Sequence, residues 1–125
     1  GAPGRRGRGV ADDGGPGMER AGGQGKVGGT ATISNSADGI AVGVPVDRAF
    51  ENSRRTVDEV MLVSDEEIIT GMRTLLTDCG LVVEPAGAAG LAAAEKLRER
   101  FAGPRVGAIV TGGNIGPDDI KRWLR

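Results

Sequence analysis

The stretch "DEVMLVSDEEIITGMRTLLTDCG", residues 58–80, decides the fold class. Residues 58–63 form a short apolar run bounded by acidic residues, which predicts a β-strand. Ser64 is followed three positions later by Glu67, the pattern of a helix capping box, and apolar residues then recur at helical spacing as far as Gly80. The sequence therefore predicts a strand followed directly by an amphipathic helix.

The same alternation continues towards the C-terminus. The segment "EPAGAAGLAAAEKLRERF", residues 84–101, predicts a helix that begins at its proline and ends before a Gly-Pro pair. The apolar run "RVGAIV", residues 105–110, predicts a buried strand, and "PDDIKRWLR", residues 117–125, a terminal helix. Alternating strands and helices indicate a mostly parallel sheet, whose ligands bind at the carboxyl ends of strands, and Thr111 follows such an end.

Two glycines interrupt the alanine-rich first half of the helix expected over 84–101. Glycine is a poor helix former, so something other than propensity favours Gly87 and Gly90. Tight packing of the helix on a sheet, close approach of another backbone or a flat ligand would each account for them.

The turn "TGGN", residues 111–114, lies between a predicted strand and a predicted helix, where many α/β proteins bind phosphate. Asp118 and Asp119 already place negative charge at the start of that helix, which argues against a phosphate. The turn also lacks the lysine of a P-loop and the glycine spacing of a dinucleotide site. A hydroxyl presented to a neutral, flat ligand and a plain tight turn both remain open.

Composition excludes several classes of protein. The chain has 125 residues, a formal net charge of -1, one cysteine and no histidine. These features exclude an internal disulfide, a catalytic triad with a histidine base and a histidine-ligated metal site, and they give no overall basic field for nucleic acid or membrane. Without a membrane-spanning run or a signal-peptide core, a cytoplasmic location is expected.

The chain divides near residue 30. Residues 1–29 hold roughly half of the 23 glycines and few apolar residues, so a glycine-rich loop or disordered segment is expected there, followed by one domain over residues 30–125. The basic cluster "RRGR" at 5–8 is typical of a solvated tail, and a nucleic-acid patch is the alternative. A short helix is predicted over residues 47–56.

Four segments together resemble a known family. They are, in order, "SADGIAV", "VDEVMLVSDEEI", "GLVVEPAGAAGLAAAEKL" and "VGAIVTGGNI". Their order and spacing over residues 37–124 are similar to those of the threonine and serine dehydratases, fold type II pyridoxal-phosphate enzymes related to serine racemase, and a looser similarity extends back to residue 9. The resemblance implies an α/β fold with a partial parallel sheet flanked by helices, the C-terminal portion of a tryptophan synthase beta-like catalytic domain.

The resemblance also implies a cofactor, pyridoxal 5'-phosphate, and positions that contact it. In relatives the small polar residue before "GGN" bonds the pyridine nitrogen, which assigns that role to Thr111. Gly39 would lie beside the ring, and Glu84 would lie near its polar edge or would only favour the dipole of the following helix. The turn around the ring would be shaped by Gly112, Gly113 and Asn114.

Departures from the family limit what this chain is expected to do. The family attaches the cofactor through a Schiff-base lysine and holds its phosphate in a tetraglycine loop, and neither segment is present. Lys26, Lys96 and Lys121 stand in other contexts, and the last two are expected to be solvated. The chain is therefore predicted to be a dehydratase fragment that is inactive alone. Ala11 replaces a cation-binding glutamate of some relatives, so no metal site is expected.

Two other interpretations of the chain's function remain open. One is a truncated, non-catalytic module that binds a small ligand or a partner, and another is a different fold type II enzyme such as threonine synthase or serine racemase. The parent enzyme is expected to be a cytoplasmic homo-oligomer of amino-acid metabolism, such as isoleucine biosynthesis, that acts on a small amino acid and binds neither nucleic acid nor membrane. A half sheet exposes apolar surface, so the isolated chain is expected to be marginal, aggregation-prone or dimeric.

Overall fold

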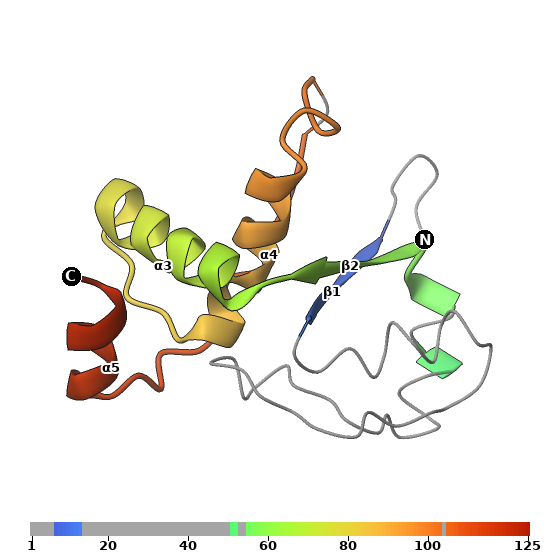
Figure 1. The fold of residues 1–125 in the computed structure, drawn as a ribbon. Coiled ribbons are helices and arrows are strands. Elements are labelled where there is room, and N and C mark those ends of the chain that lie inside the picture. Colours follow the sequence, from blue (N-terminus) through green and yellow to red (C-terminus); the bar gives the residue numbers. More distant parts are fainter. Residues whose placement is uncertain (1–6, 14–50, 53–54, 104) are drawn as a thin grey trace.

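The computed structural model describes residues 7–13, 51–52, 55–103 and 105–125. Strand β1 (Arg8–Asp12) pairs in parallel with strand β2 (Glu59–Val63), with Arg8 opposite Glu59 and Asp12 opposite Val63. Helices α3 (Asp65–Cys79), α4 (Pro85–Lys96) and α5 (Pro117–Trp123) follow (Figure 1). The expected α/β class with a small parallel sheet and flanking helices is confirmed.

Helix α3 begins and ends where the sequence predicts. The Glu67 N–H donates to Ser64 Oγ over 3.3 Å, and the Ser64 N–H donates to Glu67 Oε2 over 2.9 Å, so the capping box is formed. At the other end Gly80 takes a left-handed conformation with φ of 67°, which a residue with a side chain rarely adopts. Local signals therefore fix both ends of this helix.

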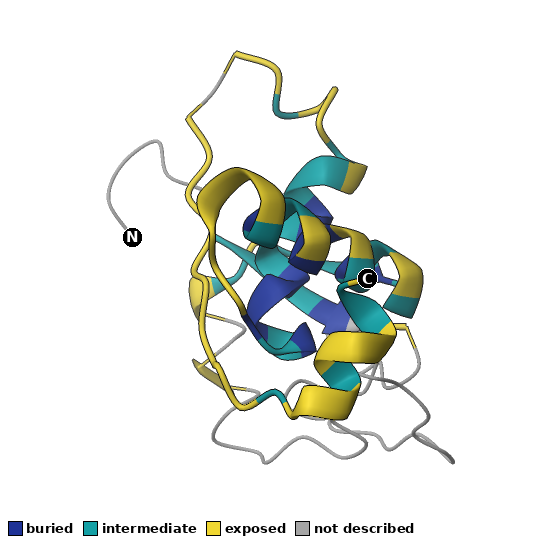
Figure 2. Ribbon diagram, turned by 90° about the vertical axis from the view of Figure 1, so that its left-hand side faces the viewer, coloured by how far each residue is buried: buried dark blue, intermediate teal, exposed yellow. Residues whose placement is uncertain are grey.

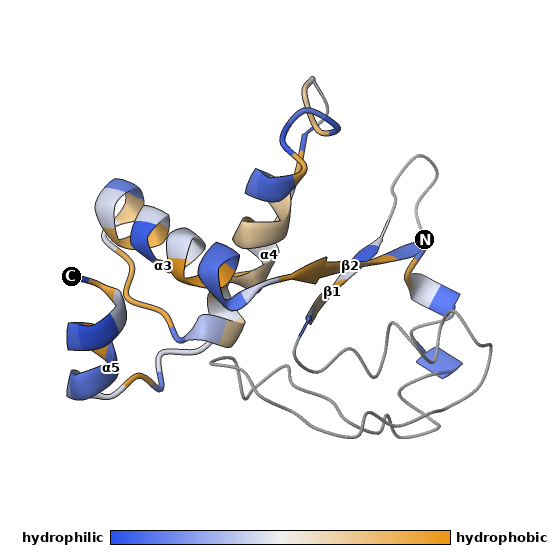
Figure 3. Ribbon diagram, viewed as in Figure 1, coloured by the Kyte–Doolittle hydropathy of each residue, from blue (hydrophilic) through white to orange (hydrophobic). Residues whose placement is uncertain are grey.

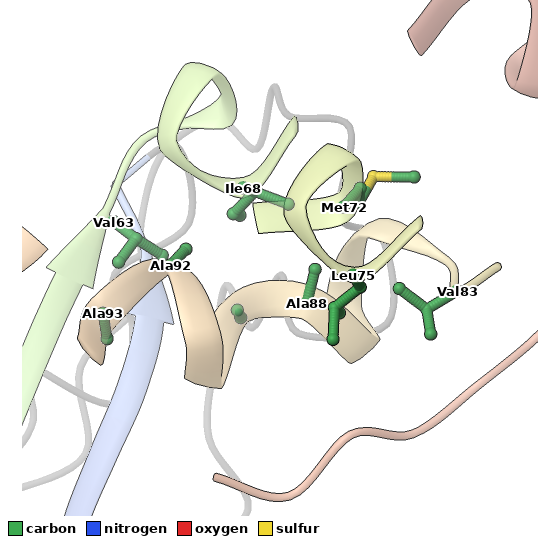
Figure 4. Packing of buried hydrophobic residues seen from close by; sticks show 9 residues of the cluster. Val63, Ile68, Met72, Leu75, Val83, Ala88, Ala92 and Ala93 are labelled. Carbon is green, nitrogen blue, oxygen red and sulfur yellow. The ribbon is translucent and has the colours of Figure 1, made fainter. Parts of the chain in front are cut away.

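The core lies where α3 and α4 pack together and where β2 ends (Figure 4). A Cβ built on Gly71 of α3 would lie 3.3 Å from the backbone nitrogen of Ala92, so this glycine lets the two helices approach closely. The buried cluster consists of Val63, Ile68, Met72, Leu75, Val83, Ala88, Ala89, Ala92 and Ala93.

Residues 105–110 do not form the buried strand predicted from their apolar run. They carry no regular secondary structure and are exposed along their length (Figure 2). Ile109 is 84% exposed. A strand requires a neighbour whose backbone completes its hydrogen bonds. The sheet in the described part of the chain contains only β1 and β2, and residues 108 and 109 lie instead beside Gly90 of α4.

Two further expectations are corrected in the N-terminal segment. Residues 1–29 were expected to lack structure, but β1 lies within them because β2 offers it a parallel partner. Arg8 of the basic cluster is not a solvated tail residue, since its Nε lies 3.2 Å from Glu59 Oε2 and its guanidinium lies over the ring of Phe101. The rest of the division at residue 30 stays a prediction.

The helix expected to continue to residue 101 ends at Lys96 and gives way to turns. Arg98 and Ala102 donate to carbonyls three residues back, so the chain tightens and leaves the α-helix there. Arg100 in these turns donates to both carboxylate oxygens of Glu59. Of the helix predicted over 47–56, residues 51–52 and 55–56 are helical and the others lie outside the described residues.

Candidate cofactor site

The start of α4 and the turn 111–114 meet at one place in the structure. The Glu84 N–H donates to the Gly112 carbonyl oxygen over 3.3 Å, and the Asn114 N–H donates to Glu84 Oε2 over 3.2 Å. Glu84 thus contacts the turn through both its backbone and its side chain. It is the N-cap residue of α4, yet its side chain makes no capping bond to its own helix.

Glycines permit this close approach. A Cβ built on Gly87 would overlap the carbonyl oxygen of Thr111, so only glycine fits beside the turn at this position of α4. Gly112 has φ of 70°, and a Cβ there would overlap the Glu84 side chain. Close approach of another backbone, one of the explanations open for Gly87, is the one that the structure supports.

Four of the six residues expected at the cofactor form this turn, and Glu84 contacts it. Thr111, Gly112, Gly113 and Asn114 are all exposed, and Glu84 is half-buried. The sixth, Gly39, lies outside the described residues. The structure therefore brings together the five expected residues that it describes, although their roles towards a cofactor stay predictions.

The described residues suit one end of pyridoxal phosphate. The Thr111 hydroxyl has no hydrogen-bond partner in the described part of the chain and can donate to a pyridine nitrogen. A Cβ built on Gly113 would meet nothing within 4 Å, which leaves open space beside the turn. At the start of α5, Asp118 and Asp119 occupy the first turn and would repel a phosphate.

Each of the two lysines in the described segments lies beside a carboxylate. Lys96 Nζ lies 2.9 Å from the Leu62 carbonyl oxygen and 2.9 Å from Glu67 Oε2, so it is held at the end of β2 rather than simply solvated. It lies nine residues after Gly87 on α4, which is about 14 Å along the helix axis. Lys121 lies 3.5 Å from Asp118 on the surface of α5, and Lys26 is outside the described residues.

The contact between Lys96 and Glu67 has an electrostatic consequence. Burial raises the pKa of the Glu67 carboxyl, but the hydrogen bond from the Ser64 N–H and the Lys96 ammonium outweigh it and lower the pKa below 4.5. At the other end of β2, hydrogen bonds from Arg100 and Arg8 lower the pKa of Glu59. Both carboxylates serve to join elements, and neither lies in the turn 111–114.

Among the described residues, no group of three or more cysteine, aspartate or glutamate side chains gathers to hold a metal ion, and no helix is long and apolar enough to cross a membrane. Ala11, the position expected to replace a cation-binding glutamate, is a buried residue of β1.

Comparison with known proteins identifies the class to which this fold and turn belong. The model of the pyridoxal-phosphate dependent enzyme family matches residues 2–112, and the chain belongs to this family. It is similar to an L-threo-3-hydroxyaspartate ammonia-lyase of a Pseudomonas species, with 40% identity over 93 residues, which are 74% of this chain and 27% of the relative. It is also similar to the L-threonine ammonia-lyase of Thermotoga maritima, with 42% identity over 89 residues, which are 70% of this chain and 22% of that enzyme.

Solved structures agree with this assignment. The structure of maize serine racemase superposes with a TM-score of 0.85 and 26% identity, and the match covers 97% of this chain and 39% of the racemase. The chain thus spans about a quarter of the length of the two ammonia-lyases and about two fifths of the racemase chain. The expected family, its fold and its cofactor, pyridoxal phosphate, are confirmed.

Sequence reasoning missed the contacts that connect the two parts of the site. It assigned Glu84 to the cofactor or to the helix dipole, and not to the Asn114 N–H. The signal that could have found this contact is the pairing of Gly87, a glycine one turn into an alanine-rich helix, with a glycine-rich turn downstream.

Proposed function

We propose that this chain forms one wall of the cofactor site in a pyridoxal-phosphate dependent ammonia-lyase that acts on a β-hydroxy amino acid. The observation that carries the proposal is the Thr111 hydroxyl, which has no partner among the described residues and stands in a turn bonded to Glu84. The two ammonia-lyases that resemble this chain are named for threonine and for 3-hydroxyaspartate, both β-hydroxy amino acids.

In this proposal the Thr111 hydroxyl donates a hydrogen bond to the pyridine nitrogen. Bound pyridoxal phosphate supplies an electron-withdrawing ring that stabilises negative charge on the amino acid's Cα. A neutral hydroxyl does not keep the pyridine nitrogen protonated, as a carboxylate partner does, so it tempers this withdrawal and favours elimination over transamination. Glu84 fixes the turn, Gly112 makes room for the Glu84 side chain, and Gly113 leaves open space beside the turn.

The lysine that attaches the cofactor and the loop that binds its phosphate are proposed to lie in other segments of the complete enzyme. The isolated chain should accordingly have no ammonia-lyase activity. Substrate choice between threonine, serine and hydroxyaspartate, assembly into a homo-oligomer, a cytoplasmic location and a place in isoleucine biosynthesis remain predictions for that complete enzyme.

The reading frame of the gene tests this proposal. An in-frame lysine segment and glycine loop upstream of Gly1 are expected, and the complete product should absorb visible light with pyridoxal phosphate and release ammonia from L-threonine, L-serine or threo-3-hydroxyaspartate. A start codon immediately before Gly1, with a product that neither binds pyridoxal phosphate nor releases ammonia, would favour a non-catalytic binding module instead.

A racemase is the second candidate, because serine racemase of Schizosaccharomyces pombe is 34% identical over 92 residues and the maize racemase shares the fold. The same assay separates the two activities. A racemase converts L-serine to D-serine faster than it releases ammonia, whereas an ammonia-lyase shows the reverse preference.

A further inference from the structure

Helix α5, which follows the turn 111–114, is held on the core by apolar residues at its two ends. Ile115 before it and Trp123 and Leu124 at its C-terminus are partly buried and pack against the buried cluster. The helix itself is mostly hydrophilic (Figure 3), and none of its residues, all of which the structure describes, is buried. Apolar contacts carry no direction, so they hold α5 on the core without fixing where it lies along the surface.

A directional bond supplies what the apolar contacts lack. Arg73 Nε donates to the Trp123 carbonyl oxygen over 2.8 Å, and the two residues are 50 positions apart in the sequence. Trp123 is the last residue of α5, and the last carbonyls of a helix have no partner within it. A guanidinium at this end also faces the negative end of the helix dipole. Arg73 therefore caps α5 from the neighbouring helix α3 (Figure 1).

Arg73 is carried by a well-anchored part of the chain, although its own side chain is exposed. Its neighbour in the sequence, Met72, is buried in the core, and so is Leu75. The capping box and the left-handed Gly80 fix the two ends of α3. Because α3 is held at both ends and along its buried face, the bond from Arg73 places the end of α5 relative to the core.

The position of α5 reaches the turn over a short path. Only Ile115 and one glycine separate Asn114 from Pro117, the first residue of α5. The Ile115 N–H donates to the Gly113 carbonyl oxygen over 2.9 Å, and the ring of Pro117 restricts its own backbone. A helix as short as α5 is roughly 10 Å long and moves as a rod, so a shift at its last residue also displaces the turn.

We propose that Arg73 is a positioning residue for the turn 111–114, which it fixes by holding the far end of α5. Glu84 holds the turn from α4, and Arg73 holds it from the other side through α5. Together they set the direction in which the Thr111 hydroxyl points. The inference rests on the proposed function, since that function gives the direction of this hydroxyl its role.

Two isosteric variants separate the hydrogen bond from the charge. In Arg73→Gln the amide nitrogen occupies the side-chain position of Nε and retains a donor without charge, whereas in Arg73→Met a methyl group occupies it. Amide exchange at Asn114 and Ile115 should become about threefold faster in Arg73→Met and change little in Arg73→Gln. Amides within the core formed by α3 and α4, such as that of Ala92, should exchange as in the unaltered chain.

Arg122 offers the matched control for charge. It lies next to Trp123 on α5, with its guanidinium 5.8 Å from the centre of the Trp123 ring. Arg122→Met removes the same charge from the same end of α5 and leaves the Arg73 bond in place, so exchange at Asn114 and Ile115 should not change. Equal acceleration in Arg73→Met and Arg122→Met would overturn the inference. So would unchanged exchange in Arg73→Met, or a uniform acceleration that includes the core amides.

The bound cofactor supplies a second measurement. Pyridoxal phosphate with ¹⁵N in its ring is bound to the complete gene product, in which exchange is also measured if Arg73→Met does not fold in the chain alone. Arg73→Met should move the pyridine ¹⁵N resonance towards its position in Thr111→Val, by a smaller amount, and Arg73→Gln should restore it.

This measurement separates the failure of the inference from the failure of the proposed function. A resonance that Thr111→Val moves and Arg73→Met does not would overturn the role of Arg73 and leave the proposed function standing. A resonance that neither variant moves would count against the proposed function. The exchange of the Asn114 amide then still decides whether Arg73 positions the turn.

Discussion

The main-chain N–H of Asn114 donates to Glu84 Oε2 over 3.2 Å, which ties the turn before α5 to the first turn of α4. The two residues are thirty positions apart in the sequence, and the bond acts together with the reverse contact from the Glu84 N–H to Gly112. Glu84 therefore acts in this chain as a positioning residue for the turn that contains Thr111.

Replacing Glu84 separates its acceptor role from its charge. Glu84→Ala should destabilise the chain by about 1 kcal/mol and speed exchange of the Asn114 amide roughly fivefold, because that N–H loses its acceptor. Glu84→Gln retains an acceptor oxygen and should show about half of this effect. Amide exchange followed by NMR measures both, and an Asn114 amide that exchanges equally in Glu84→Ala and in the unaltered chain would contradict the role assigned to Glu84.

Two glycines of α4 offer a matched pair. Gly87→Ala places a methyl group on the Thr111 carbonyl oxygen, and the forced shift should cost about 1–3 kcal/mol of unfolding free energy. Gly90→Ala meets Ala108 Cβ at an ordinary 3.5 Å, so the better helix propensity of alanine should leave stability unchanged or raise it by up to about 1 kcal/mol. Urea unfolding measures both, and equal effects would show that Gly87 is not chosen for the Thr111 contact.

Stability should fall as the solution becomes acidic. The folded-state pKa of Glu67 is lowered below 4.5, so its carboxylate stabilises the folded chain above about that pH and this contribution is lost as the pH falls through the lowered value. The side chain is 34% exposed, and the effect should be roughly 0.5 kcal/mol.

Unfolding followed from pH 7 into the acid range measures this effect. In Glu67→Gln the free energy of unfolding should fall less steeply as the pH is lowered. Some of the fall should remain, since Glu59, whose pKa is also lowered, keeps its own contribution. Lys96→Met removes one of the two favourable partners of Glu67. Its unfolding free energy should fall with pH less steeply than that of the unaltered chain and more steeply than that of Glu67→Gln. If the unfolding free energy of Glu67→Gln fell with pH as steeply as that of the unaltered chain, the lowered pKa of Glu67 would not be the cause of the acid sensitivity.

Local signals predicted the elements that depend on local interactions. The capping box of Ser64 and Glu67 and the left-handed conformation of Gly80 depend on residues only a few positions away in the sequence. Both ends of α3 were therefore predictable. The run 105–110 was predicted as a strand and is not one here, because strand formation depends on neighbours that the described part of the chain does not supply. Long-range pairing also explains why β1, in a glycine-rich segment, was missed.

The candidate site was predictable in its members and not in its contacts. Thr111 and the glycines after it follow from the position of the turn after an apolar run and from the family resemblance. That Gly87 lies against Thr111 depends on how α4 packs, which a single sequence does not encode in a local pattern. The structure also changed the role of Lys96, whose ammonium is held by the Leu62 carbonyl and Glu67.

The role of Thr111 is tested most directly by the bound cofactor itself. Pyridoxal phosphate labelled with ¹⁵N in its ring is titrated into the complete gene product and into its Thr111→Ser and Thr111→Val variants. Loss of the hydroxyl in Thr111→Val should weaken cofactor binding about tenfold and shift the pyridine ¹⁵N resonance, whereas Thr111→Ser should preserve both. An unchanged affinity and an unchanged ¹⁵N resonance in Thr111→Val would contradict the assignment of this turn to the pyridine nitrogen.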